Sequence, residues 1–336
     1  MNIREIAKQA GVSPATVSLV LNNKPNVNKE TRARVTVLLE ENGYQIKEKI
    51  DAPKAEAALL FLRYKSGTDR LESRDDFLVQ IMDGVETQAK ALGYALSFAS
   101  TERDRLATAL TEAAQTYAGV VVFGTELDDQ DAELLCHAPV PLCVTDTGLP
   151  LYPVHTVSIN NYGAIYEALR YLNRQGHTKI GYLHSTVQTG EIPDREISYH
   201  NAMHLLGLEV NPAFIYELDP FLNTAYKQMS AVLEQSPELP TAFIADNDML
   251  ALGAMQALQQ HGIRVPDDVS LIGFDDSHMS SMANPPLTTI RVPKQIMGSA
   301  AVRQLHHVIT NPPDKEIYKI QLGAELHERS SVMRRG

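Results

Sequence analysis

The spacing of apolar residues divides the chain into a short helical head and a long body in which strands and helices alternate. In residues 1–44, apolar side chains recur every three or four positions, which predicts three short helices. From residue 57 onward, continuous apolar runs typical of strands buried on both faces of a parallel sheet alternate with amphipathic helical stretches. Residues 45–56 are charged and show no apolar period, so we interpret them as a linker.

Cap and turn residues predict the bounds of the three helices in the head. Asn2 opens a capping box ahead of the first helix, and Gly11 suits the sharp turn at the end of that helix. Ser13 is expected to cap the second helix, whose first position holds Pro14, and Asn28 to cap the third. Two short helices joined by a glycine turn, with a third helix behind them, predict a helix-turn-helix head.

The alternation of strands and helices in the body predicts an α/β fold with doubly wound parallel sheets. Roughly 280 residues of this pattern exceed one ordinary hydrophobic core, so two lobes are expected. The expected strands cover residues 57–62, 95–99, 119–123, 142–145, 157–159, 179–183, 214–217, 242–245 and 270–273. The helices that the pattern delimits cover residues 77–92, 163–175, 198–206, 224–234 and 249–262.

Charge is unevenly distributed along the chain. Residues 1–50 hold eight Lys or Arg and five Glu, a net charge of +3, whereas the whole chain carries −11. A small basic head on an acidic body favours phosphate contact confined to one end of the chain.

No run of 18 apolar residues and no signal-peptide core is present, so we expect a cytoplasmic protein. Cys136 and Cys143 lack CxxC spacing and fit reduced, buried thiols.

The head also carries two longer motifs. Residues 6–22 read IAKQAGVSPATVSLVLN, and residues 30–35 read ETRARV ahead of Gly43 and Tyr44. Both resemble the DNA-binding signature of the lactose-repressor (LacI/GalR-type) family of bacterial transcription regulators. The resemblance implies a helix-turn-helix headpiece with a recognition helix over residues 14–22. It also implies a two-lobed sensor with the periplasmic-binding-protein fold in the body.

The resemblance assigns base contacts to three apolar residues, Pro14, Ala15 and Leu19. Apolar side chains can contact thymine methyl groups but cannot form a bidentate hydrogen bond with guanine. Polar residues of the same helix and its end would then bind mostly phosphates. The complete set of DNA-binding candidates is Ser13, Pro14, Ala15, Thr16, Ser18, Leu19, Asn22, Asn23, Lys24, Thr31 and Arg32.

Motifs in the body that resemble the family's sensor lie near strand ends. ADNDMLALG at 245–253 and GFDD at 273–276 follow apolar runs, and open α/β sheets bind ligands at the carboxyl ends of their strands. By the resemblance, Asn247 faces the cleft, Asp275 is the pocket aspartate and Arg195 is the ligand-binding arginine. A carboxylate accepts hydrogen bonds and a guanidinium group donates them, so the two together can bind the hydroxyl groups of a ligand. The ligand-binding candidates are Phe77, Asp146, Arg195, Phe221, Asn247 and Asp275.

Other polar residues of the body fit structural roles better than functional ones. We expect Asp248 to cap the helix that follows the strand at 242–245. His177, after a glycine helix terminus, is expected to be a structural hydrogen-bonding residue. His200 and His204 are four residues apart on a helix but have no neighbouring Glu and no third ligand, so no metal site is expected. No catalytic or cofactor-binding motif is identifiable, so neither an enzyme nor a cofactor is expected.

The linker departs from the family pattern. Family members carry a Pro-Asn step, an alanine and a leucine there, which fold into a short hinge helix on DNA. In this chain the step falls on Ile46 and Lys47, the alanine position on Ile50 and the leucine position on Pro53. Proline lacks the N–H that helix bonding needs and pushes the preceding residue out of the helical region. We therefore expect residues 45–56 to form an extended tether or at most one helical turn.

The sequence thus predicts a ligand-responsive transcription regulator, most simply a repressor that binds a near-palindromic operator as a homodimer. The expected small molecule is a sugar bound between the lobes. The alternatives are a non-regulatory soluble sugar-binding protein, a regulator that responds to a nucleobase, and an enzyme on the same scaffold.

Five residues follow Ser331, too few for a tetramerising coiled coil. The expected domains are a headpiece at 1–44, a linker at 45–56, and a sensor at 57–332 with an N-lobe at 57–156 and 286–317 and a C-lobe at 157–285 and 318–332.

Overall fold

The computed structural model describes residues 2–21, 27–42, 44, 57–66, 75–188, 190–312 and 316–335. Tertiary contacts divide the chain into two units, Met1–Pro53 and Lys54–Gly336, which we call the headpiece and the sensor. The expected linker at 45–56 lies outside the described residues, so an extended tether there stays a prediction.

The described residues of the headpiece form three helices, which begin where the cap residues predict. They are α1 (Ile3–Ala10), α2 (Pro14–Leu21) and α3 (Lys29–Glu41). The Asn2 side chain accepts hydrogen bonds from the backbone N–H groups of Arg4 and Glu5, and Gly11 has φ +64°. The helices enclose a small apolar core made by Ile6, Ala7, Ala10, Val17, Val20, Val35 and Leu39. The helix-turn-helix prediction is confirmed.

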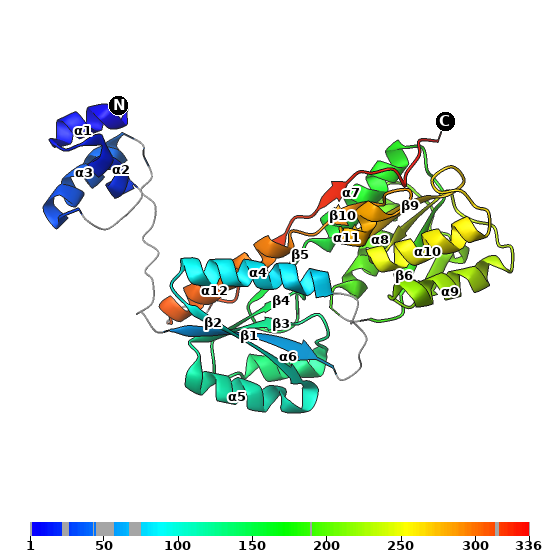
Figure 1. Ribbon diagram of the computed structural model, residues 1–336, viewed down its shortest axis with the longest axis horizontal. Coiled ribbons are helices and arrows are strands. Elements are labelled where there is room, and N and C mark those ends of the chain that lie inside the picture. Colours follow the sequence, from blue (N-terminus) through cyan, green and yellow to red (C-terminus); the bar gives the residue numbers. More distant parts are fainter. Residues whose placement is uncertain are drawn as a thin grey trace. The chain divides into compact units, whose positions relative to one another are not determined.

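The first lobe of the sensor, the N-lobe, is a six-stranded parallel sheet in the order β11-β5-β4-β3-β1-β2. Helices α4 and α12 lie side by side on one face, and α5 and α6 cover the other (Figure 1). The strands are β1 (Ala58–Lys65), β2 (Ala95–Glu102), β3 (Gly119–Phe123), β4 (Leu142–Thr145), β5 (Thr156–Ile159) and β11 (Lys319–Leu322). The helices are α4 (Asp75–Ala91), α5 (Leu106–Thr116), α6 (Asp129–Cys136) and α12 (Lys294–Thr310).

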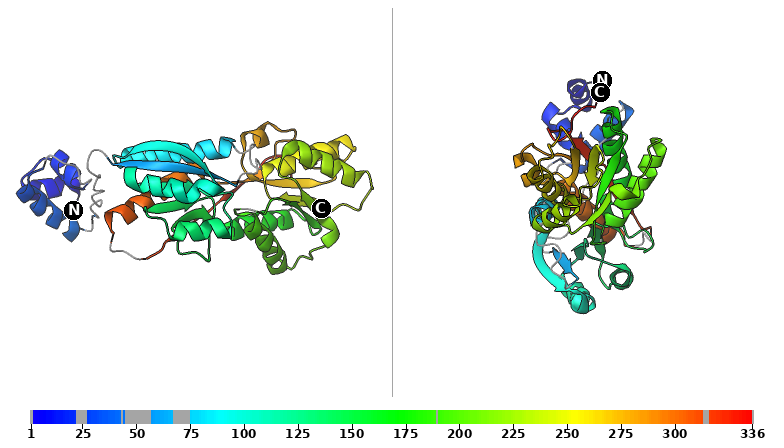
Figure 2. Two further views of the ribbon diagram at one scale, coloured as in Figure 1. Left: turned by 90° about the horizontal axis from the view of Figure 1, so that it is seen from below. Right: turned by 90° about the vertical axis from the view of Figure 1, so that its right-hand side faces the viewer.

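The second lobe, the C-lobe, is a six-stranded sheet in the order β12-β10-β9-β8-β6-β7, in which β12 runs antiparallel to β10 and the other neighbouring strands are parallel. Helices α7 and α8 pack together, as do α9 and α10, and the views in Figure 2 show the sheet between helices. The strands are β6 (Ile180–Ser185), β7 (Ile215–Leu218), β8 (Ala242–Ala245), β9 (Ser270–Asp275), β10 (Thr288–Arg291) and β12 (Glu325–His327). The helices are α7 (Asn161–Arg174), α8 (Ile192–Leu205), α9 (Leu222–Leu233), α10 (Asp248–Gln260) and α11 (His278–Met282).

The sheet order corrects the expected positions at which the chain crosses between the lobes. We expected crossings near Thr156, Pro285 and Tyr318, each ahead of a strand. Strands β5 and β11 belong to the N-lobe and β10 belongs to the C-lobe. The chain therefore crosses to the other lobe after each of these strands and not before it. The reason is physical: an apolar run shows that a strand is buried on both faces but not which of two similar sheets it joins.

His177 has the structural role that the sequence predicts. The ring is fully buried, Nδ1 lies 2.9 Å from the Thr241 hydroxyl oxygen, and Nε2 lies 3.0 Å from the Met333 carbonyl oxygen. Burial lowers the pKa of His177. The neutral His177 side chain therefore links the C-terminal segment to the start of β6 through a hydrogen bond.

Candidate functional site

The second helix of the headpiece presents most of its DNA-binding candidates to solvent. Ser13, Pro14, Ala15 and Ser18 are exposed, whereas Thr16 and Leu19 are half-buried. The Ser13 hydroxyl accepts a hydrogen bond from the Thr16 backbone N–H at 3.1 Å, which is the expected helix cap. The apolar stripe faces the other way, because Val17 and Val20 are fully buried. Thr31 and Arg32 on α3 are half-buried, and Asn22, Asn23 and Lys24 lie outside the described residues.

Arg195 lies in the first turn of α8 and is almost completely buried. Its Nε donates to the Asn161 side-chain oxygen at 3.2 Å, and one Nη donates to the Asp246 carbonyl oxygen at the end of β8. The guanidinium carbon stands 3.7 Å above the centre of the Phe274 ring, a cation–π contact. The arginine thus joins α8, the start of α7 and the ends of β8 and β9.

Asn247, and not Asp248, caps helix α10, which corrects our expectation. The Asn247 Oδ1 atom accepts from the Leu250 backbone N–H at 2.8 Å. Asp248 occupies the first helical position, where its carboxylate accepts from the Thr289 hydroxyl at 2.5 Å and the Ser277 N–H at 2.6 Å. Burial raises the pKa of Asp248 to about 7, and the nearby Asp275 charge adds to the shift. Both residue types cap helices well, so the sequence did not distinguish them.

Asp275 ends strand β9 in a strained backbone conformation. Its φ is +111°, a value that side chains with a Cβ rarely adopt, and only 7% of its surface is exposed. Strained residues that persist in a native fold cluster at functional sites. Next to it, Asp276 accepts hydrogen bonds from Arg291 Nε at 2.6 Å and Arg329 Nη2 at 2.5 Å. Burial opposes the ionisation of Asp276, but its hydrogen bonds with Arg291, Arg329 and His327 and the charge of Arg329 hold its pKa at about 2.

A second group of acidic residues meets where the two lobes adjoin. Asp146 follows β4 of the N-lobe with φ +64°, and its carboxylate accepts from the Thr125 hydroxyl. Glu191 precedes α8 of the C-lobe, and its Oε2 accepts from the Asn161 side-chain amide. The two segments pass close to each other, because a Cβ added to the adjoining Gly190 would meet the carbonyl oxygens of Thr125 and Asp146. Burial raises the pKa of Glu191 to about 8, and the Asp146 charge adds to the shift.

The two aromatic candidates differ in their surroundings. Phe77 lies buried in the first turn of α4, and the Lys294 Nζ atom stands 5.6 Å from its ring centre. That Nζ also donates to the Asp276 carbonyl oxygen at 3.3 Å, so Phe77 lies near the strand end that carries Asp275. Phe221 is the half-buried residue before α9.

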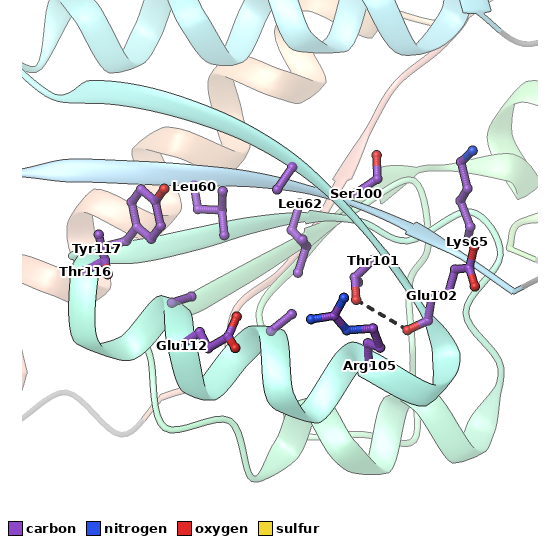
Figure 3. A pocket seen from close by; sticks show the side chains of 13 residues that line it. Leu60, Leu62, Lys65, Ser100, Thr101, Glu102, Arg105, Glu112, Thr116 and Tyr117 are labelled. Carbon is purple, nitrogen blue, oxygen red and sulfur yellow. Dashed lines mark hydrogen bonds between the residues drawn. The ribbon is translucent and has the colours of Figure 1, made fainter.

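A separate hollow lies on the outer side of the N-lobe, between β2 and α5. Figure 3 shows its lining, with Leu60 and Leu62 on β1 and Arg105 and Glu112 near or on α5. The cavity measures about 620 Å³. None of the predicted ligand residues lines it, so it is distinct from the groups around Arg195 and Asp146.

Sequence reasoning missed two residues of the site, Asn161 and Glu191. The expected helix at 198–206 begins at Ile192 in the structure, so the segment that carries Glu191 and Arg195 was not recognised as a helix start. Pro193, a helix breaker in most contexts, is tolerated in a first helical turn. That position, together with Gly190 at φ +60°, is the signal that marks the start of α8.

The described part of the chain contains no helix that is long and apolar enough to cross a membrane. Over the same residues, no group of three or more His, Cys, Asp or Glu side chains is placed to hold a metal ion.

A helix-turn-helix headpiece on a two-lobed sensor, with polar side chains gathered at the strand ends, defines a DNA-binding transcription regulator. Residues 2–46 match the model of "Bacterial regulatory proteins, lacI family", and residues 169–332 match that of a periplasmic binding protein-like domain. The chain is 34% identical over 317 residues, 90% of each chain, to the HTH-type transcriptional repressor PurR of Aliivibrio salmonicida. It is 30% identical over 306 residues, 88% of each chain, to the HTH-type transcriptional regulator DegA of Bacillus subtilis.

Solved structures show the same architecture over the whole chain. A complex of the transcriptional regulator CelR with cellobiose aligns with a TM-score of 0.71 at 26% identity and covers 98% of this chain and 99% of the other. The lac repressor dimer bound to operator and the anti-inducer ONPF aligns with a TM-score of 0.71 at 25% identity and covers 99% of each chain. The protein belongs to the LacI family of bacterial transcription regulators.

Proposed function

We propose that this regulator is a repressor that binds a near-palindromic operator as a homodimer and responds to a small molecule bound between the lobes of its sensor. The observation that carries the proposal is that Arg195 of α8 contacts Asp246 and Phe274, the residues directly before Asn247 and Asp275. In open α/β sheets, ligands bind in the crevice outside the carboxyl ends of the strands. Asp146 and Glu191 lie where the lobes adjoin, so a ligand bound there would contact both lobes.

The proposed ligand is a sugar or a sugar derivative. A guanidinium group donates hydrogen bonds and a carboxylate accepts them, and hydroxyl groups on adjacent carbons do both. Asn247 uses its Oδ1 atom as the helix cap, so its amide NH₂ would be the group that meets the ligand. The solved CelR structure, in which a regulator of similar fold holds cellobiose, supports this choice.

A purine base is the second candidate. Several relatives bear the name PurR, among them the repressor of Aliivibrio salmonicida. Phe77 is buried near the site and would offer an aromatic ring to a planar ligand. Against this candidate, the guanidinium of Arg195 already occupies one face of the Phe274 ring.

Selection of binding sites from a pool of random double-stranded DNA with the full-length protein tests the proposed operator binding. Two headpieces related by a two-fold axis bind half-sites about one helical turn, or roughly 10 base pairs, apart. We expect the enriched sequences to contain two inverted half-sites at a fixed spacing. Enrichment of single, unpaired half-sites would contradict binding as a dimer, and the absence of any enriched sequence would contradict operator binding.

Replacing thymine by uracil at the contacted positions of the operator should weaken binding. The exposed side chains of Pro14 and Ala15 cannot donate side-chain hydrogen bonds, so we expect them and Leu19 to contact thymine methyl groups. Loss of one buried methyl costs about 0.8 kcal/mol, or about fourfold in Kd. Fluorescence anisotropy with singly substituted operators measures the effect, and uracil outside the half-sites is the control. Unchanged affinity at every half-site thymine would contradict this assignment.

A further inference from the structure

We propose, on the basis of the proposed function above, that the small molecule carries a protonated amine beside its hydroxyl groups, as an amino sugar does. The amine would bind between Glu191 of the C-lobe and Asp146 of the N-lobe. Glu191 would then determine specificity by accepting a hydrogen bond from the ammonium group.

The first observation is an unpartnered carboxylate oxygen. Glu191 is 4% exposed, and its Oε2 accepts a hydrogen bond from Asn161, but its Oε1 is buried without a hydrogen-bond partner among the described residues. A buried polar atom without a partner costs free energy. A ligand that donates a hydrogen bond to Oε1 would remove this cost. Burial raises the pKa of Glu191 to about 8, so its carboxyl group without a bound ligand is largely protonated at neutral pH. An ammonium group bound at Oε1 would favour the ionised form, because an adjacent opposite charge lowers the pKa of a carboxyl group.

The second observation is the local excess of negative charge. Asp146 and Asp194 both act on Glu191 with charges of the same sign, and Arg195 is the opposing cation. Arg195 directs its Nε to Asn161 and one Nη to the Asp246 carbonyl oxygen, so these donors are committed to the fold. A neutral hydroxyl would satisfy Oε1 but leave the excess of carboxylates. An ammonium cation would donate a hydrogen bond to Oε1 and would also balance the negative charge, because opposite charges in a partly buried site attract strongly.

The third observation concerns the position of the carboxylate between the lobes. A Cβ added to Gly190 would meet the carbonyl oxygens of Thr125 and Asp146, so the backbone before Glu191 passes close to the N-lobe. Asn161, the partner of Glu191, begins α7 directly after the crossing that follows β5. An ammonium group held by Asp146 and Glu191 would therefore join the lobes, which a ligand must do to change their closure.

Matched pairs of sugars test the proposal on the full-length protein. The probes are glucosamine with glucose, galactosamine with galactose, and mannosamine with mannose, measured by the shift of the thermal unfolding midpoint at neutral pH. A hydrogen bond between charged groups is stronger than one to a neutral hydroxyl. We therefore expect at least one amino sugar to bind about 10- to 100-fold more tightly than the neutral sugar with which it is paired. Equal or tighter binding of the neutral members would overturn the proposal, as would a panel in which no amino sugar raises the midpoint.

The variant Glu191→Gln keeps the size of the side chain and an acceptor for Asn161 but removes the charge. We expect it to reduce the preference for the amine to about twofold or less. Glu126→Gln is the matched control, because Glu126 is also buried near Asp146 but its carboxylate accepts from the Ser66 N–H and hydroxyl at 2.8 Å each. A preference that survives in Glu191→Gln, or that Glu126→Gln removes equally, would contradict the role of Glu191.

Operator binding in the same samples separates this inference from the proposed function. An amino sugar that binds without changing operator affinity would support the amine site and contradict regulation through it. A neutral sugar that binds more tightly than its amine and changes operator affinity would support regulation and contradict the amine site.

Discussion

Asp275→Ala should leave operator binding intact and abolish the response to the effector. The carboxylate ends strand β9 beside Phe274, over which the Arg195 guanidinium lies, and is the acceptor that we propose for ligand hydroxyl groups. Two hydrogen bonds to a charged group contribute about 3–6 kcal/mol, so loss of the carboxylate should weaken effector binding at least about a hundredfold. Titration of the operator with and without effector measures the response. An unchanged effector titration would remove Asp275 from the site.

Asp275→Gly is a companion variant with a second readout. The backbone at this position has φ +111°, which glycine adopts without steric cost and alanine does not. We expect both variants to lose the effector response. The glycine variant should nevertheless be more stable than the alanine variant by about 1 kcal/mol in denaturant unfolding, because the strain is relieved. An alanine variant as stable as the glycine variant would contradict strain at this strand end.

Gly298→Ala should destabilise the sensor by about 1–3 kcal/mol, although alanine is a better helix former than glycine. Helices α4 and α12 pack backbone to backbone at this point. A Cβ added to Gly298 would overlap the Ile81 carbonyl oxygen, and a Cβ added to Gly84 would overlap the Gln295 carbonyl oxygen. A backbone carbonyl cannot rotate away as a side chain does, so the two helices must separate. The gain in helix propensity, about 1 kcal/mol, is smaller than this cost.

The free energy of unfolding, measured with chemical denaturant, tests this packing. Gly323→Ala is the control, because a Cβ at Gly323 meets no atom within 4 Å and its φ is not positive. We expect the control to lie within about 0.5 kcal/mol of the unsubstituted protein. A Gly298→Ala protein as stable as the control would contradict the close contact between α4 and α12.

Local signals predicted the headpiece and most strand positions. Asn2, Gly11 and Ser13 act within a few residues of their own position, so cap and turn chemistry sufficed to place the helices. Strands such as β3 and β8 are continuous apolar runs with the bounds that the pattern indicates. The lobe crossings could not be predicted, because the same apolar run fits either sheet.

The candidate site was predicted in part. The motifs at strand ends indicated Arg195, Asn247 and Asp275, and the structure brings the segments that carry them together. Glu191 was missed because its importance depends on Asp146, 45 positions earlier in the chain and in the other lobe. The α4–α12 contact depends likewise on Gly84 and Gly298, which a sequence pattern does not connect. Non-local contacts of this kind become visible only in the folded chain.

The central claim is that a ligand in the sensor and DNA on the headpiece influence each other's binding. The most direct test measures the operator Kd with and without the ligand that most raises the unfolding midpoint, and the Kd of that ligand with and without operator. Coupling between two sites is reciprocal and has typical factors of about 5–150. We predict that the two Kd values change by the same factor, of at least about fivefold, and that Asp275→Ala removes both changes. An operator Kd that is the same with and without bound ligand would contradict the claim.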